Sequence, residues 1–167
     1  MDLSLERVYR LINVRPFLSS FVSVFTGCAA GYLLSGDGKI HYISHNPLTL
    51  IDIKNVGEIL IRNLLFVIVL VILSIINSRL PLIILFLNAA VVGILLQRLG
   101  IQQFIYVVLP HGIPEMTAIV IISGTLIKYH IASFREKMKK LIWPLALYFT
   151  SVFFEVYITP WLVSIFL

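Results

Sequence analysis

Five stretches of the chain are almost uninterrupted apolar sequence, and short polar segments separate them. The stretches are residues 16–34, 59–76, 81–96, 104–127 and 141–162. A helix needs about 20 apolar residues to cross roughly 30 Å of hydrocarbon, so these stretches have about the length of membrane spans. The pattern predicts an all-α, polytopic integral membrane helix bundle with about five transmembrane helices.

Composition agrees with a membrane protein. Of the 167 residues, 59% are hydrophobic and 13% are charged, whereas soluble domains are nearer half apolar and a quarter charged. We therefore expect a single transmembrane domain over residues 1–167 and the lipid bilayer as its surroundings. The single cysteine, Cys28, excludes a disulfide framework and a cysteine-based zinc site. No nucleic-acid-binding motif is present, so no nucleic-acid partner is expected.

Three polar segments flank or join the apolar stretches. Residues 1–14 place apolar side chains among charges at helical spacing, which predicts an interfacial amphipathic segment. Residues 35–58 are expected to form an outer polar loop, and residues 128–140 a cytoplasmic basic loop. Phe25 to Cys28 loosely resembles a lipoprotein cleavage site, but the apolar run continues to Leu34, so we expect an uncleaved helix.

The basic residues predict the orientation in the cell membrane. Five crossings from a cytoplasmic N-terminus put nine Lys and Arg residues inside and four outside, which agrees with the positive-inside rule. The inner set is Arg7, Arg10, Arg15, Arg79, Lys128, Arg135, Lys137, Lys139 and Lys140, and the outer set is Lys39, Lys54, Arg62 and Arg98. We therefore expect a multi-pass protein with a cytoplasmic N-terminus and an extracellular C-terminus.

The segment from Leu109 to Glu115 is the leading candidate for a functional site. It places His111, Glu115, a glycine and two prolines in apolar sequence. Because proline removes a backbone donor, the fourth helix is expected to be broken at Pro110–Pro114. Hydrocarbon cannot solvate an ion or a freed backbone, so the segment must be buried in protein or line a wet cavity.

A second carboxylate lies at the same membrane depth. Glu115 is 13 residues from Lys128, and Glu155 is 15 residues from Lys140. At 1.5 Å per residue these are roughly 20 and 22 Å above the inner boundary, so the two carboxylates can meet beside His111.

This grouping points to acid–base chemistry. Glu115 opens an apolar helix, where the helix dipole favours an anion. Glu155, beside a second carboxylate, is expected to keep its proton, and such a pair beside the His111 imidazole suits general acid–base catalysis. By the same depth count Asn63 and Asn88 lie at roughly 24 and 14 Å, so an amide can join the site.

Other interpretations of the same residues stay open. The polar groups could form a buried polar cluster that fixes helix packing, or they could form a proton or ion relay. A metal ion at His111, Glu115 and Glu155 is possible by ligand type but is not favoured, because the spacing differs from the His-Glu-x-x-His of zinc peptidases. Ser123 and Ser151 have no base at a recognisable spacing, which disfavours a serine nucleophile.

Ser23, Gly27 and Gly31 form two overlapping pairs of small residues in the first crossing. Small side chains let a second helix approach closely. The pattern predicts packing within the bundle, with a homodimer through these residues as the alternative.

Three stretches of sequence carry a family resemblance. They are residues 61–65 (IRNLL), 87–93 (LNAAVVG) and 109–115 (LPHGIPE), and residues 154–160 (FEVYITP) fit the end of the last helix. Together they resemble the stage II sporulation protein M family of bacterial and archaeal membrane proteins, over roughly residues 59–161. Where family members often have paired asparagines, this chain has Arg62 before Asn63.

The resemblance implies a function and a set of site residues. Members are associated with peptidoglycan remodelling during sporulation, and small relatives with circular bacteriocins, where leader removal, ring closure, export or immunity have been proposed. We expect processing or maturation of a hydrophobic peptide, as an intramembrane peptidase or peptide-ligating enzyme. The alternative is a non-enzymatic export, immunity or cell-envelope role beside partner membrane proteins. The implied residues are His111, Glu115 and Glu155 for catalysis and Asn63 and Asn88 for binding.

Overall fold

All elements that the structure describes are helices. The computed structural model describes residues 15–36 and 53–166. In chain order the helices are α2 (Pro16–Leu34), α3 (Ile53–Ile76), α4 (Leu80–Val107), α5 (Leu109–Lys128), α6 (Phe134–Phe153), the π-helical turn η2 (Phe154–Ile158) and α7 (Thr159–Phe166). Because α6, η2 and α7 follow one another without a gap, they form one rod. The described chain is thus a bundle of five rods, which confirms the predicted fold class.

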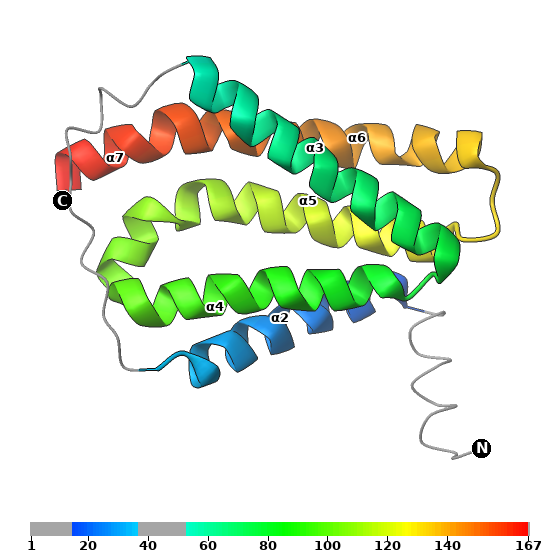
Figure 1. The fold of residues 1–167 in the computed structure, drawn as a ribbon, viewed down its shortest axis with the longest axis horizontal. Helices are drawn as coiled ribbons and strands as arrows, with labels where there is room; N and C mark the ends of the chain where they lie inside the picture. The colour runs from blue at the N-terminus through cyan, green and yellow to red at the C-terminus, as the bar shows by residue number, and fades with distance from the viewer. Residues whose placement is uncertain (1–14, 37–52, 167) are drawn as a thin grey trace.

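Successive rods run in opposite directions (Figure 1). α2, α4 and the α6–α7 rod run one way, and α3 and α5 run the other way. The starts of α2, α4 and α6 therefore gather at one end of the bundle, together with the ends of α3 and α5. Lys128 at the end of α5 and the basic residues in the first turns of α6 lie at the same end of the bundle as the start of α2.

Four of the five rods are long and apolar enough to cross a membrane. They are Pro16–Leu34, Val56–Ile76, Leu80–Val107 and Phe134–Phe166. α5 is less apolar because His111, Glu115 and two prolines lie in its first two turns. Its other half is enclosed by neighbouring helices, and residues 122–127 are all buried. By helix length and composition the chain is a multi-pass membrane protein.

The fourth rod is not broken at Pro110–Pro114, so this part of the prediction was wrong. α5 is one continuous helix that contains Pro114. Pro110 lies in its first turn, where a missing N–H has no intrahelical partner to lose. The chain changes direction earlier, at Gly100, whose φ of 73° and ψ of 163° interrupt α4. That conformation is accessible almost only to glycine.

α2 packs most extensively against α4, through small residues. A Cβ on Gly27 or Gly31 would overlap a backbone carbonyl oxygen of α4. Ser23 Oγ donates a hydrogen bond to the carbonyl oxygen of Leu82 at 2.6 Å. The predicted packing of this face within the bundle is therefore confirmed. A homodimer through the same residues remains a prediction, and it would require α2 to leave α4.

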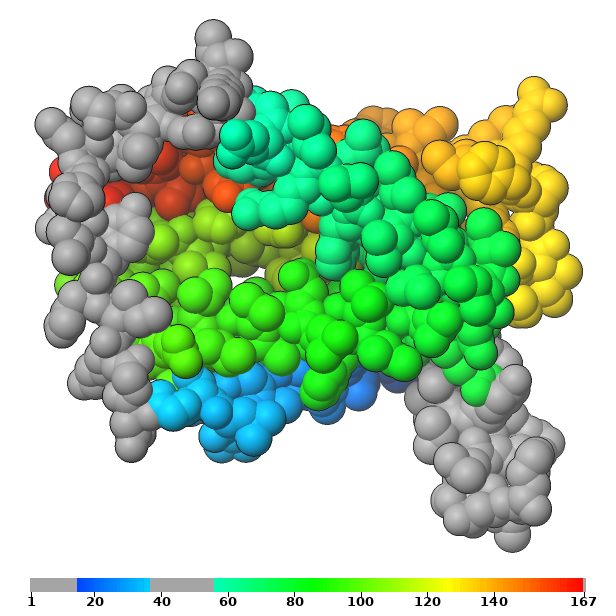
Figure 2. Space-filling model, in the orientation of Figure 1, coloured from blue at the N-terminus to red at the C-terminus, as the bar shows by residue number. Residues whose placement is uncertain are grey.

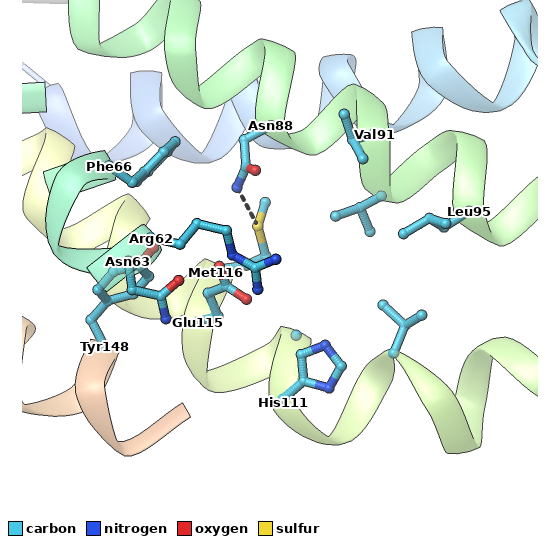
Figure 3. A pocket seen from close by; sticks show the side chains of 13 residues that line it. Arg62, Asn63, Phe66, Asn88, Val91, Leu95, His111, Glu115, Met116 and Tyr148 are labelled. Atoms are coloured by element: carbon cyan, nitrogen blue, oxygen red, sulfur yellow. Dashed lines mark hydrogen bonds between the residues drawn. The ribbon is translucent and has the colours of Figure 1, made fainter. Parts of the chain in front are cut away.

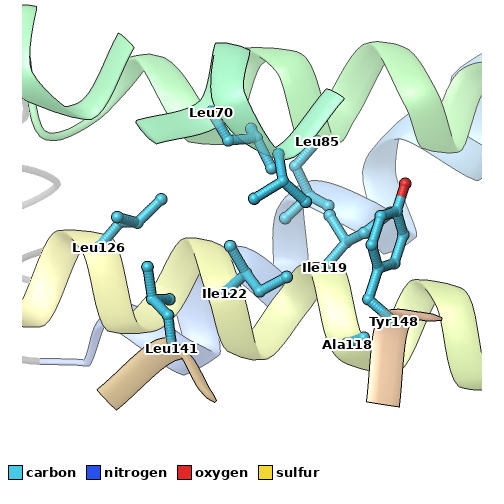
Figure 4. Packing of buried hydrophobic residues seen from close by; sticks show 9 residues of the cluster. Leu70, Leu85, Ala118, Ile119, Ile122, Leu126, Leu141 and Tyr148 are labelled. Carbon is cyan, nitrogen blue, oxygen red and sulfur yellow. The ribbon is translucent and has the colours of Figure 1, made fainter. Parts of the chain in front are cut away.

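An apolar cluster lies where α3, α4, α5 and α6 meet (Figure 4). Its buried members are Val67, Leu70, Leu85, Ala118, Ile119, Ile122, Leu126, Leu141 and Tyr148. The ring of Tyr148 packs into the cluster, while its hydroxyl group points away from it. The cluster therefore fixes the rotation of α5 and α6 next to the predicted site.

The polar segments are shorter than the sequence predicted. α3 begins at Ile53, so residues 53–58 of the expected outer loop are helical. α6 begins at Phe134 because Ser133 caps it by accepting a hydrogen bond from the N–H of Glu136 at 3.4 Å. Residues 134–140 of the expected basic loop are therefore the first two turns of α6, and Lys128 is the last residue of α5. The predicted amphipathic segment, residues 1–14, and residues 37–52 of the polar loop lie outside the described residues.

Candidate functional site

A cavity of about 320 Å³ opens between α3, α4, α5 and α6. We call it the polar cavity, after the six polar side chains in its lining: Arg62, Asn63, Asn88, His111, Glu115 and Tyr148. In the space-filling view the surface is hollowed between α4 and α5, beside α3 (Figure 2). Four of the five residues predicted from the sequence line this cavity (Figure 3), and Glu155 is the exception.

His111 and Glu115 share one face of α5. They are four residues apart, so they lie one above the other on the helix. The continuity of α5 through Pro114 preserves this alignment. His111 Nδ1 lies 3.2 Å from Thr159 Oγ1, and either atom can donate, depending on the imidazole tautomer. The first residue of α7 thereby orients the His111 ring.

The two asparagines approach the cavity from α3 and α4. Asn63 is only 5% exposed and makes no side-chain hydrogen bond to the rest of the described chain. Asn88 Nδ2 lies 3.6 Å from Met116 Sδ, which is a weak acceptor. Each amide carries two N–H donors and an acceptor oxygen, so both retain hydrogen-bonding capacity toward the cavity.

Glu155 reaches the site through Arg62. Arg62 Nη2 donates to Glu155 Oε1 at 3.3 Å, which joins α3 to η2. The charges of Arg62 and Glu155 act on both His111 and Glu115. These four ionisable groups therefore form one electrostatic cluster, with Glu155 behind Arg62 and not at the cavity wall.

The π-helical turn η2 explains the position of Glu155. Pro160 has no N–H, and its ring crowds the carbonyl group of Val156 four residues earlier. The widened turn accommodates this, and the N–H of Thr159 bonds to the carbonyl oxygen five residues before it. Such turns are frequent at functional sites. Here the turn places Glu155 beside Arg62 of α3. It also places Thr159 beside His111 of α5.

Two of the six polar residues that line the polar cavity, Arg62 and Tyr148, were not predicted as site residues from the sequence. Arg62 was counted among the outer charges and noted as a departure from the paired asparagines of the family, yet two carboxylates at one level in an apolar bundle call for a cation. Tyr148 precedes Glu155 by seven residues, a spacing that puts both on one side of a helix. Tyr148 interacts with Glu115. The charge balance and the helical spacing were the available signals.

The charged side chains of the site are only partly buried, and this limits the chemistry that they can support. No charged side chain in the described ranges is fully buried, and His111, Glu115 and Glu155 are all half-buried. Within residues 15–36 and 53–166, no three His, Cys, Asp or Glu side chains are grouped to hold a metal ion. Ser123 and Ser151 do not line the polar cavity. The arrangement provides a base, proton donors and binding groups for an ion or a peptide backbone.

Comparison with known proteins identifies the family. The stage II sporulation protein M family model matches residues 20–160. This range contains the polar cavity, all five predicted site residues and the π-helical turn. No curated protein and no solved structure matches the chain. Because the family model covers most of its length, the chain belongs to the stage II sporulation protein M family.

Proposed function

We propose that this protein acts in the processing or maturation of a hydrophobic peptide within the membrane, with precursors of the circular-bacteriocin type as the substrate class. The observation that carries the proposal is the polar cavity itself. It gathers an imidazole, a carboxylate, a guanidinium group and two amides within an apolar bundle. Ionisable groups at membrane depth are costly, and they generally serve a functional site or pair with one another.

Glu115 is the proposed general base. It would take a proton from water, or from a peptide amine, as that group attacks a peptide carbonyl, and the proton would then pass to the departing amine. N–H groups of Arg62 and Asn63 are available to stabilise the oxyanion formed in the attack. Glu155 acts as a positioning residue, because its contact is with the guanidinium group of Arg62.

A peptide could enter from the lipid. Val91 and Leu95 line the polar cavity from α4, and Val91 is 54% exposed on the exterior surface of the helix bundle. The rim of the cavity is therefore continuous with an apolar surface that would face acyl chains. A hydrophobic peptide dissolved in the bilayer could bring a backbone group to Glu115 without crossing water.

A non-enzymatic role in export, immunity or the cell envelope is the second candidate. It is favoured by the ion pair between Arg62 and Glu155, which connects α3 with the last rod. A pair of that kind holds helices together whether or not chemistry occurs beside it.

The test compares Glu115→Gln and His111→Gln with the unchanged protein in the producing cell. Mass spectrometry of hydrophobic peptides in membranes and medium should show precursor accumulating and mature product falling by about 10²- to 10⁴-fold, the usual contribution of a general base or acid. Glu136→Gln, at an exposed carboxylate at the start of α6, is the matched control. Normal amounts of mature peptide in the Glu115→Gln cells would contradict processing. Mature peptide retained in the cell, or self-killing, would support the second candidate.

A further inference from the structure

A second cavity adjoins the polar cavity and is apolar. It has a volume of about 280 Å³ and lies between α2, α4 and α5. We call it the apolar pocket; Cys28, Leu96 and Phe104 belong to its lining alone. Val92, Val108, Gly112 and Met116 line both cavities. The two volumes therefore adjoin, one polar and one apolar, and they share four lining residues.

The cluster of Arg62, Glu115 and Glu155 at the polar cavity carries two carboxylates and one guanidinium group. When Glu115 and Glu155 are ionised, Arg62 is the one cation that faces them among the residues lining the polar cavity. An uncompensated charge at membrane depth is costly. A ligand that carries one positive charge would balance the cluster.

We propose that the peptide is bound by its amino-terminal residue, with the free ammonium group beside Glu115 in the polar cavity and a large apolar side chain in the apolar pocket. This inference rests on the proposed function and specifies the substrate of the same site. It requires a first residue of the size of leucine or phenylalanine and an unblocked amine.

The surrounding groups favour a peptide over an amine-bearing lipid. Glu115 is the seventh residue of α5, about 10 Å along the helix from its start, whereas lipid headgroups stay at the membrane surface. Asn63 and Asn88 offer donors and acceptors suited to the N–H and C=O groups of a peptide backbone.

The apolar pocket would select by shape. Lipid tails are as apolar as a leucine side chain, so a peptide arriving from the bilayer gains packing contacts but little hydrophobic free energy. Filling the pocket should therefore exclude large first residues and leave small ones unaffected. Leu96→Trp fills the pocket, and Leu87→Trp is the control on the same helix, because Leu87 is 54% exposed on the outer face.

Binding to the full chain in lipid nanodiscs tests the inference. The probe is a synthetic 20-residue Leu- and Ala-rich peptide with a fluorophore at its C-terminus, made with a free N-terminal leucine, an acetylated N-terminal leucine or a free N-terminal glycine. Acetylation should raise the Kd at least about tenfold, a difference of about 1.4 kcal/mol. Glu115→Gln should weaken the free-amine peptides and leave the acetylated peptide unchanged.

The pocket variant gives an independent readout. Leu96→Trp should weaken the leucine peptide at least about tenfold and leave the glycine peptide unchanged, which also shows that the variant is folded. Leu87→Trp should change neither peptide. Equal binding of acetylated and free peptides, or equal weakening of the leucine and glycine peptides, would overturn the inference. Displacement of the leucine peptide by phosphatidylethanolamine in the nanodisc would assign the site to a lipid amine instead.

These results separate the two proposals. The binding experiment could show the preference for a free amino terminus and a large first residue while Glu115→Gln cells mature their peptide normally. That result would support the binding site and contradict the processing function. If maturation depends on Glu115 but binding ignores the amino terminus and the Leu96→Trp change, the function stands and this inference fails.

Discussion

A single methyl group at Gly31 would test the contact between α2 and α4. The added Cβ would overlap the carbonyl oxygen of Ala90, and it would lie 2.6 Å from the carbonyl carbon and 2.8 Å from Cα of the same residue. Ordinary van der Waals contact begins at 3.4 Å, and the oxygen lies nearer still than these two carbon atoms, so α2 must move by more than about 0.8 Å. No side-chain rotation can relieve the clash, because the atoms that it meets belong to the backbone.

The expected loss of stability in Gly31→Ala combines three effects. Overpacking a packed interior costs about 1–3 kcal/mol. Moving α2 also lengthens the 2.6 Å hydrogen bond from Ser23 Oγ to Leu82, and such a bond contributes about 0.5–1.5 kcal/mol. Alanine is a better helix former than glycine by about 1 kcal/mol, which offsets part of the loss. We expect a net loss of about 1–3 kcal/mol, or roughly a 5- to 150-fold fall in the ratio of folded to unfolded protein.

Unfolding in mixed micelles with increasing sodium dodecyl sulfate, followed by circular dichroism, measures this change. Gly57→Ala is the control because it lies within α3 and has nothing within 4 Å of its added Cβ. It gains the same helix propensity without a clash, so it should be as stable as the unchanged protein or more stable. If Gly31→Ala were as stable as Gly57→Ala, the close approach of α2 and α4 would be refuted.

Three further predictions concern the turn before α5, the cavity and the topology. Gly100→Ala should lose about 1–3 kcal/mol in the same titration, because its backbone conformation is strained for any side chain although its surroundings are open; an unchanged midpoint would contradict this. Tyr148→Phe keeps the ring in the core and should change stability by about 1 kcal/mol or less, while peptide maturation falls; normal maturation would show that the hydroxyl group has no part. In a Cys28→Ser background, cysteines at Ile131 and Phe166 should be labelled by an impermeant reagent from opposite sides of the membrane, and labelling from one side would refute five crossings.

The helices were predictable because the length of an apolar run has a direct physical meaning. The predicted first span matches α2 residue for residue, and the others overlap α3 to α7. The break at Pro110–Pro114 was wrong because the effect of a proline depends on its position along the helix. Pro110 lies in the first turn of α5, where its missing N–H costs nothing. The chain changes direction instead at Gly100, within α4.

The level of the site residues along the helices could be predicted from the sequence, but the rotation of each helix about its axis could not. A fixed rise per residue brought Glu115 and Glu155 to one level, and their charges do interact. The rise per residue carries no information about the rotation of α3 and of the last rod about their own axes. The rotation is set by packing of the apolar cluster, which turns Arg62 and Tyr148 toward the polar cavity and leaves Glu155 against Arg62.

The π-helical turn makes the last rod two helices that are out of phase with each other. Each residue of an α-helix advances the direction of its side chain by about 100°, and a π-helical turn absorbs roughly one extra residue. If residues 154–158 closed into regular α-helix without losing a residue, α7 would therefore rotate by about 100° about its own axis and swing Thr159 away from His111, although every side chain of α5 would be unchanged. The orientation of the His111 ring thus depends on the extra residue that this turn holds: closing the turn at constant length would break the contact between Thr159 and His111, whereas deleting one residue as the turn closes would keep α7 in phase.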